Sequence, residues 1–240
     1  MTAGTTPTGI LAAASVSDDV VALRPDYRAL LVVVSGVRGG PSDHVSDAAL
    51  RRAEDSVRRR LAGAPPETLP EIAAWREAFR AFGVKPRAAR SSVESLIRRI
   101  DAGLPRIDRL TDLYNAVSVE HLVPVGGENL SAYVGPPRLV RAVGDEPFDT
   151  TADGEPVTVT AAPGEVIWAD EVGVTCRRWN WRQCVRTRLD ESTTDILFIL
   201  DGLQPLTTEA LQAAGAALVD GVTADAPGAT VVSRLIGRDG

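Results

Sequence analysis

The sequence predicts an α+β fold in which a mostly helical N-terminal half packs on a mainly antiparallel sheet. Three observations support this prediction. Amphipathic helical patterns dominate the first half of the chain, short β-branched runs separated by turns fill the segment from Pro124 to about Gly202, and one helix and one strand follow. Helices followed by a block of antiparallel strands are typical of the α+β class.

The first half predicts one strand and four helices. Residues 29–40, "ALLVVVSGVRGG", form a β-branched run closed by glycines, which fits a buried strand. Helical spacing follows over residues 46–63, 72–83, 91–100 and 109–122. Ser46 is a possible cap of the first helix, and Ser91 of the third. Glu94 lies three residues after Ser91, which is the spacing of a capping box.

The second half predicts a series of short strands. They fall at residues 138–143, 156–161, 165–170, 172–179 and 194–200, and a helix over 207–222 and a strand over 229–236 end the chain. Asp153-Gly154 is a hairpin signal, because both positions of a type I′ turn need positive φ.

Composition indicates a single globular domain at residues 21–240, preceded by a flexible tail at residues 1–20. The 44% hydrophobic content is enough for a substantial core, and no apolar run is long enough to span a membrane. The two cysteines favour a reducing cytoplasm. Neither metal-ligand spacing nor a nucleotide-binding glycine motif is present, so we expect no metal and no cofactor.

The segment "CRRWNWRQC", residues 176–184, contrasts with a net charge of −6. As a hairpin with its tip near Asn180, it would place Cys176 opposite Cys184. As an extended strand, it would direct Trp179 and Trp181 to one face, where they could line a pocket or stack on a base. The simpler alternative is that one tryptophan belongs to the core and the other packs under an arginine by a cation–π contact.

The segment "VPVGGENL", residues 123–130, is a second candidate for binding. Gly126 and Gly127 allow a ligand to approach the backbone closely, and Glu128 adds a polar group, although an ordinary turn explains the pattern equally well. His121 closes the preceding helix, where the helix dipole favours it without any catalytic role. We find no Ser-His-Asp set and no histidine beside either cysteine.

The order of motifs from residue 75 to residue 201 resembles a known family. "AWREAFRAFGVKPRAARSSVESLIRRI", "LPRIDRLTDLYNAVSVEHLVPVGGENL", "GDEPF" and "WNWRQCVRTRLDESTTDILFILDG" are similar to the B3/B4 domain of the bacterial phenylalanyl-tRNA synthetase β subunit, and most of all to stand-alone proteins that carry this domain. The resemblance implies an α+β domain whose synthetase version hydrolyses tyrosine wrongly esterified to the phenylalanine tRNA.

The resemblance also implies where a site would lie. Asn115 matches an asparagine of the editing pocket, the histidine position falls at Gly126–Gly127, and Gln183 is the nearest equivalent of the pocket's glutamate. We therefore expect Asn115, Asn180 and Gln183 to be catalytic. Substrate-binding residues are then expected at Gly126, Gly127, Glu128, Trp179, Trp181 and Arg182.

These residues predict an aminoacyl-tRNA editing hydrolase that acts in trans. An aminoacyl ester is already activated, so a positioned water, with the amides of Gly126 and Gly127 at the developing oxyanion, would need neither metal nor covalent nucleophile. The candidates for tRNA binding are Arg98, Arg99, Arg177, Arg178 and Arg186. Two alternatives stay open: a non-catalytic module that binds an amino acid or a similar small metabolite in the same pocket, and altered chemistry on an amino-acid-derived substrate.

Overall fold

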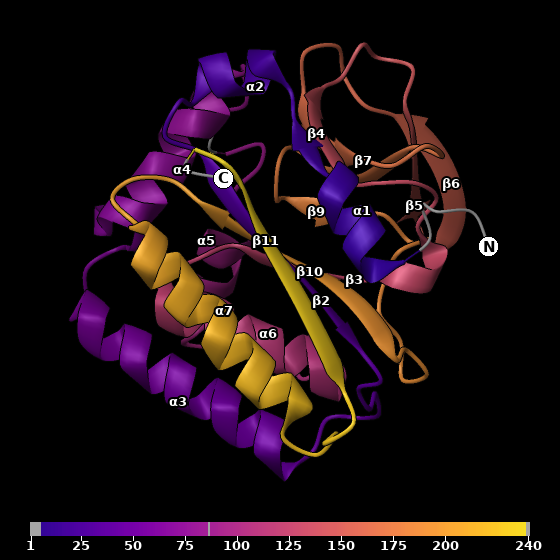
Figure 1. Cartoon of the computed structure of the whole chain (residues 1–240). Helices are drawn as coiled ribbons and strands as arrows, with labels where there is room; N and C mark the ends of the chain where they lie inside the picture. The colour runs from indigo at the N-terminus through magenta and orange to yellow at the C-terminus, as the bar shows by residue number, and fades with distance from the viewer. Residues whose placement is uncertain (1–5, 86, 239–240) are drawn as a thin grey trace.

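A four-stranded antiparallel sheet of order β11-β2-β10-β3 runs through the middle of the computed structural model, which describes residues 6–85 and 87–238 (Figure 1). Its strands are β2 (Arg28–Ser35), β3 (Val125–Asn129), β10 (Asp195–Gly202) and β11 (Thr230–Gly237). The two inner strands, β2 and β10, are apolar on both faces because both faces of the sheet are covered.

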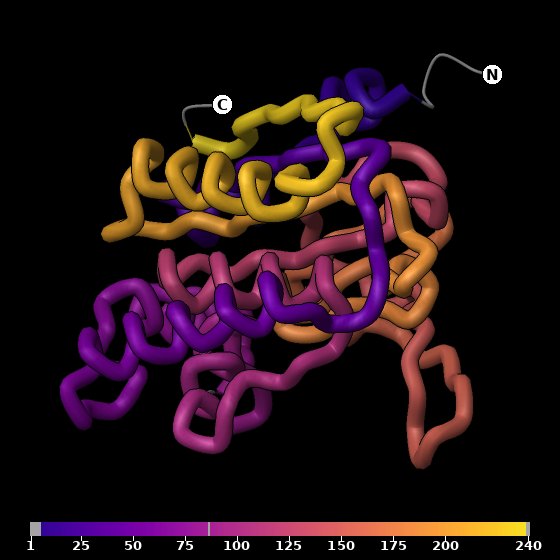
Figure 2. Tube along the Cα trace, turned by 90° about the horizontal axis from the view of Figure 1, so that it is seen from below, coloured from indigo at the N-terminus to yellow at the C-terminus, as the bar shows by residue number. Residues whose placement is uncertain are grey.

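Helices cover one face of this sheet. Alternate residues of β2 and β10, such as Val32 and Phe198, pack against α6 (Arg109–His121) and α7 (Thr208–Thr223). Helix α3 (His44–Leu61) packs against α6, and Figure 2 shows these helices running alongside one another. A smaller cluster of apolar residues joins α3 and α6 to α4 (Pro70–Ala81) and α5 (Ser92–Ile97), with the short turn η1 (Pro66–Thr68) between α3 and α4.

The opposite face packs against a second sheet. This sheet has five strands in the order β1-β4-β7-β8-β9, and its members are antiparallel except that β1 pairs in parallel with β4. The core between the sheets contains Leu31, Ile199, Trp168 and Trp179. The strand bounds are β1 (Ser15–Val16), β4 (Arg138–Arg141), β7 (Val166–Ala169), β8 (Val174–Arg177) and β9 (Arg182–Gln183), and the turn η2 (Leu130–Ala132) follows β3.

A two-stranded hairpin, β5 (Pro147–Ala152) and β6 (Glu155–Thr160), projects from the second sheet (Figure 2). Asp153 and Gly154 form its turn, with φ of +52° and +87°. The predicted Asp-Gly hairpin turn is therefore confirmed.

The N-terminal segment forms regular structure where the sequence predicted a flexible tail. Residues 1–5 lie outside the described part, but α1 (Pro7–Ala13) and β1 follow, and α2 begins in the same segment (Asp18–Leu23). Leu11 of α1 is buried in the core between the sheets, and β1 extends the second sheet. The sequence pattern missed this edge because β1 is only two residues long.

Two predicted helix caps differ in detail. Asp43, not Ser46, caps α3, and Ser46 is the third residue of a capping box in which each side chain bonds to the other's backbone. Ser91 caps α5 as predicted. Glu94 does not return to the cap, because its fully buried carboxylate accepts hydrogen bonds from Arg76 and Arg98.

No helix among residues 6–85 and 87–238 is long and apolar enough to cross a membrane.

Candidate functional site

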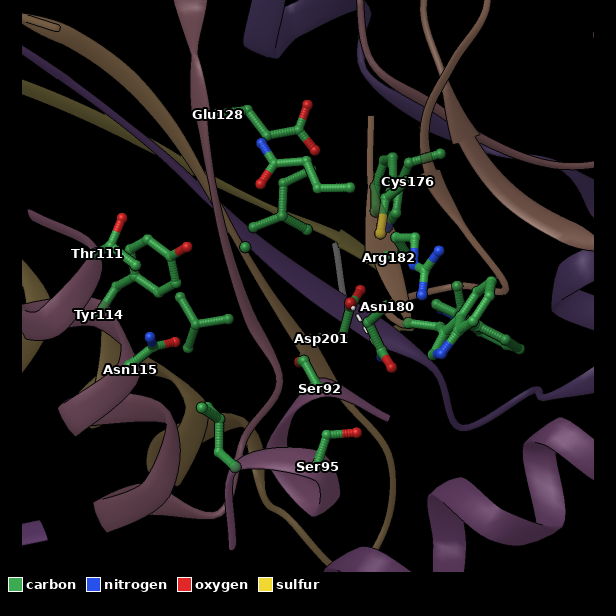
Figure 3. A pocket seen from close by; sticks show the side chains of 18 of the residues that line it. Ser92, Ser95, Thr111, Tyr114, Asn115, Glu128, Cys176, Asn180, Arg182 and Asp201 are labelled. Atoms are coloured by element: carbon green, nitrogen blue, oxygen red, sulfur yellow. Dashed lines mark hydrogen bonds between the residues drawn. The ribbon is translucent and has the colours of Figure 1, made fainter. Parts of the chain in front are cut away.

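A cavity of about 310 Å³ lies between the edge strand β3, the helices α5 and α6, and the hairpin of β8 and β9 (Figure 3). Ile199 and Asp201 of β10 contribute to its wall. It is lined by Ser92, Ser95, Leu96, Arg99, Pro105, Ile107, Thr111, Tyr114, Asn115, Val125, Gly126, Glu128, Trp168, Cys176, Trp179, Asn180, Trp181, Arg182, Gln183, Ile199 and Asp201. Most of the sequence-predicted substrate-binding and catalytic residues are therefore brought to one place.

The segment 176–184 is a hairpin, with β8 and β9 joined by a turn in which Arg178 and Trp179 have positive φ of +47° and +68°. Cys176 pairs with Gln183 rather than with Cys184, so the predicted register is wrong by one residue, and both cysteines are free. The difference arises because Arg178 and Trp179 begin the turn, which shifts its centre away from Asn180.

The two tryptophans of the hairpin have different environments. Trp179 is fully buried and makes edge contacts with Tyr27 and Trp75. Trp181 is only partly buried, and the guanidinium groups of Arg178 and Arg182 lie 4.3 and 4.5 Å from its ring centroid. The alternative of one core tryptophan and one cation–π tryptophan is confirmed, and both rings also line the cavity.

The two glycines of "VPVGGENL" lie in strand β3, a strand that the sequence reading did not predict. A Cβ on Gly127 would lie 2.9 Å from Cε1 of Tyr114, whereas a Cβ on Gly126 would meet nothing within 4 Å. Gly127 thus lets the Tyr114 ring pack on the strand, and only Gly126 faces the cavity. The sequence suggested a turn because glycine and polar residues are depleted in strands.

The backbone amide and carbonyl groups of Gly126 and Gly127 point to opposite sides of β3. The Gly127 carbonyl accepts a hydrogen bond from Gln183 Nε2 at 2.9 Å, so it points away from β10. Since the amide and carbonyl of one strand residue point to the same side, the Gly127 amide lies at the outer edge of β3 and the Gly126 amide points to β10. The Gly126 amide is thus turned toward β10, and Gly127 is not among the residues that line the cavity, so the role of both amides as donors to a ligand stays a prediction.

Asp201 is a buried acid at the end of β10. Its Oδ1 accepts a hydrogen bond from the Tyr27 hydroxyl at 2.6 Å, and its Oδ2 accepts one from Asn180 Nδ2 at 3.2 Å. Burial raises the pKa of this carboxyl to about 7, although these hydrogen bonds favour the ionised form. Asp201 is therefore able to hold or to release a proton near neutral pH.

Glu128 of β3 is the second buried acid of the cavity, and 2% of its surface is exposed. The Tyr133 hydroxyl donates to its Oε2 at 2.5 Å. Burial raises the pKa of Glu128 to about 7 as well. A carboxyl with this pKa can act as a general base at neutral pH, which the sequence reading did not find in this site.

The three predicted catalytic residues all line the cavity, but their hydrogen bonding differs. Gln183 uses its amide to hold the carbonyls of Gly127 and Thr187, which ties β9 to the edge of β3. Asn180 donates to Asp201, and its Oδ1 is buried without a partner among the described residues. Asn115 is buried on α6, on the wall that also carries Tyr114 (Figure 3).

The predicted tRNA-binding arginines divide into two groups. Arg98, Arg177 and Arg186 form ion pairs with Glu94, Glu165 and Asp170, respectively. Arg178 contacts Trp181 and lies near Glu165, and Arg99 is exposed at the cavity. The exposed Arg99 and Arg182 are named the rim arginines below.

Asp201, Ser92 and Tyr114 line the cavity and were missed by sequence reasoning. Asp201 directly follows the apolar run at residues 196–200, but no local pattern indicates that it lines a cavity. Cys176 also lines the cavity, but burial, together with nearby Glu128 and Asp201, raises the pKa of its thiol well above the ordinary value. A thiolate nucleophile is therefore disfavoured.

The described residues contain no group of three or more histidine, cysteine, aspartate or glutamate side chains placed to hold a metal ion. The chemistry available in the cavity is thus that of two titratable carboxyls, amide and hydroxyl groups, and guanidinium groups at its opening.

The chain belongs to the B3/4 domain family, whose model matches residues 74–215. It is also similar to a solved structure, an N-terminal fragment of the phenylalanyl-tRNA synthetase β subunit from Pyrococcus horikoshii. The identity is 13% and the TM-score is 0.45, over 91% of this chain and 49% of that fragment, so the chain spans about half of the fragment's length. Comparison with curated proteins gives no match.

Proposed function

We propose that this chain is an aminoacyl-tRNA deacylase that acts in trans, hydrolysing the ester of a mischarged tRNA. The observation that carries the proposal is Glu128, a buried carboxyl with a pKa of about 7 that lines a cavity in a B3/4 domain. The volume of about 310 Å³ is at the lower end for small-molecule pockets, so it suits a single aminoacyl group.

In this reaction Glu128 takes a proton from a water molecule as the water oxygen bonds to the ester carbonyl carbon. The bond from that carbon to the ribose oxygen then breaks, and Glu128 returns the proton to the ribose oxygen. The products are a free amino acid and a tRNA with its hydroxyl restored. The Tyr133 hydroxyl holds Glu128 Oε2, and hydrogen bonds from Thr175 and Thr187 also favour the ionised form of this carboxyl, which is the form that accepts a proton.

The neighbouring groups support this assignment. Asn115 also lines the cavity, where its side-chain amide could donate to the developing oxyanion. The rim arginines lie where the chain of a nucleic acid would leave the cavity, and guanidinium groups bind phosphates.

The test is deacylation of a panel of cognate and mischarged aminoacyl-tRNAs by the wild type, Glu128→Gln and a control variant, Asp195→Asn. Asp195 lies at the other end of β10, outside the cavity. We expect rapid release from one species, and a loss of roughly 10²–10⁴-fold in Glu128→Gln, which is the usual contribution of a general base. Equal, slow release from every tRNA would contradict the proposal.

A non-catalytic module for an amino acid or a similar metabolite is the second candidate. It is favoured by the net charge of −6 and by the ion pairs that already engage Arg98, Arg177 and Arg186. Salt dependence separates the two candidates. Binding to tRNA through several arginines weakens steeply as salt rises, whereas binding of a small neutral ligand changes little.

A further inference from the structure

A group of three polar side chains faces the cavity apart from Glu128. This group, named the Asp201 cluster, consists of Asp201, Asn180 and Ser92, which belong to β10, the β8–β9 turn and α5. Two hydrogen bonds fix their relative positions: Asn180 Nδ2 donates to Asp201 at 3.2 Å, and the Ser92 backbone amide donates to the Asn180 carbonyl at 3.0 Å. Figure 3 shows the three side chains next to one another.

The Asp201 cluster has hydrogen-bond acceptors that the described residues do not use. Asn180 Oδ1 and Ser92 Oγ are buried and have no partner in that part of the chain, and Asn180 is 8% exposed. Asp201 Oδ1 accepts a hydrogen bond from Tyr27 and Oδ2 accepts one from Asn180, and the Trp168 indole also favours the ionised form of this carboxyl. A buried amide oxygen without a partner costs free energy, which a ligand with a matching donor would recover.

The charge around the cluster restricts the ligand further. Among the described residues that line the cavity, the basic ones are Arg99 and Arg182, and both are exposed. The inner wall next to the cluster therefore contains an ionisable carboxyl and the oxygens of Asn180 and Ser92. It also contains the indole N–H groups of Trp168 and Trp179, for which no hydrogen-bond partner is found among the described residues. A primary ammonium group has a positive charge and three N–H donors, one for each of the three side chains.

We propose that the Asp201 cluster is a subsite for a primary ammonium group, the α-amino group of the aminoacyl substrate. The inference rests on the proposed function for the identity of the ligand. It assigns a role in substrate recognition to the Asp201 cluster, whereas the proposed function assigns the chemical step to Glu128. It assigns Asp201 as a specificity-determining residue. Acylation of the amino group would remove the charge and two of the N–H donors, so aminoacyl groups with a blocked nitrogen are rejected.

Isothermal titration calorimetry with small probes tests the subsite without tRNA. The probes are primary amides of several L-amino acids, the same amides with an N-acetyl group, and the corresponding α-hydroxy amides. For at least one side chain, we expect the free amine to bind the wild type roughly 10- to 100-fold more tightly than its two analogues, which is the range for hydrogen bonds to charged groups.

Asp201→Asn should remove most of this preference, because the amide keeps the shape of the carboxylate but not its charge. Asp195→Asn makes the same replacement on the same strand outside the cavity and should keep the preference. If Asp201→Asn does not fold, the affinities of the wild type for the three probe series are sufficient to test the proposal. The proposal is overturned if no free amine binds at millimolar concentration, or if the three series bind alike.

The two proposals fail separately. A preference for free amines without deacylation of any aminoacyl-tRNA would support the subsite and leave the protein as a binding module. Deacylation by a protein that binds amine and hydroxy probes equally would support the proposed function and refute the ammonium subsite.

Discussion

Replacement of Glu128 by glutamine tests whether this buried carboxyl has a raised pKa and what it costs the fold. Glutamine has nearly the same shape and still offers an oxygen to the Tyr133 hydroxyl, which donates to Glu128 at 2.5 Å. Unlike glutamate, it cannot ionise. The variant therefore separates the effect of charge from the effect of packing.

The magnitude follows from the pKa of Glu128, which burial raises from an ordinary 4.5 to about 7. At pH values below 4.5 the carboxyl is protonated in both the folded and the unfolded protein, and its neutral form is stable in the cavity. As the pH rises through 7, the folded protein must hold a buried carboxylate, and the stability that the neutral form provided is lost. The difference between 4.5 and about 7 corresponds to about 3 kcal/mol of unfolding free energy.

The assay is urea unfolding of the wild type and of Glu128→Gln at several pH values from about 5.5 to 8.5. We expect the free energy of unfolding of the variant, relative to the wild type, to rise by about 2 kcal/mol over this range and to level off above pH 7. The neighbouring groups Tyr133, Asp170 and Cys176 keep one charge state in the folded protein over this range, because the pKa values of Tyr133 and Cys176 are raised well above their ordinary values and that of Asp170 is lowered.

Glu146→Gln is the matched control. Burial opposes ionisation of Glu146, but backbone amides outweigh it and lower its pKa, so its contribution to stability is lost only when the pH falls below the ordinary value. The free energy of unfolding of Glu146→Gln, relative to the wild type, should therefore not change with pH over the same range. If the free energy of unfolding of Glu128→Gln, relative to the wild type, also does not change with pH, the raised pKa of Glu128 is refuted. The role of this carboxyl as a base is then refuted as well.

Three further substitutions test the walls of the cavity by urea unfolding. Gly127→Ala places a methyl group 2.9 Å from a ring atom of Tyr114 and should lower the free energy of unfolding by about 1–3 kcal/mol. A methyl group at Gly126 would meet nothing within 4 Å, so Gly126→Ala should change this free energy by less than about 1 kcal/mol. Equal effects would contradict the packing described for β3. Trp179→Ala should lower the free energy of unfolding by about 3–5 kcal/mol, because the Trp179 ring is fully buried. Trp181→Ala should lower it clearly less, because the Trp181 ring is only partly buried. The reverse order would mean that Trp181, and not Trp179, packs in the core. Glu94→Gln should cost about 1.5–3 kcal/mol, because it removes the buried carboxylate that Arg76 and Arg98 share, although both partly exposed arginines keep Glu67 as a partner. A loss near zero would show that this ion pair is open in solution.

Much of the fold was predictable because periodicity depends on burial. Strands β2 and β10 are apolar at nearly every position, since helices cover one face and the second sheet covers the other. The main helices were found from their apolar spacing, and the β5–β6 turn from Asp153-Gly154. Strand β3 was missed because its glycines reflect a tertiary contact and not a local preference. Gly127 leaves space for the ring of Tyr114, and the sequence around Gly127 does not show that this ring packs there.

The candidate site was predicted in outline, and its chemistry was not. Asn115 and Gln183 were named from motif order, Asn180 and Glu128 were named from the segments that contain them, and all four line the cavity. The titratable groups were missed because a raised pKa is a property of the surroundings. Glu128 in "VGGEN" looks like a solvated turn residue until β3 is paired with β10 and covered by Tyr133. Asp201 becomes notable only when Tyr27, distant in sequence, is placed against it.

The two carboxyls have the same pKa but are suited to different tasks because their neighbours differ. Glu128 lies on β3 and accepts a hydrogen bond from Tyr133. Asp201 lies beside Asn180 Oδ1 and Ser92 Oγ, which have no partner among the described residues. Near pH 7 each carboxyl is about half ionised when no ligand is bound. In the proposed complex, an ammonium group would favour the ionised form of Asp201, so the ligand would add little net charge to the interior, and Glu128 could still accept a proton from water.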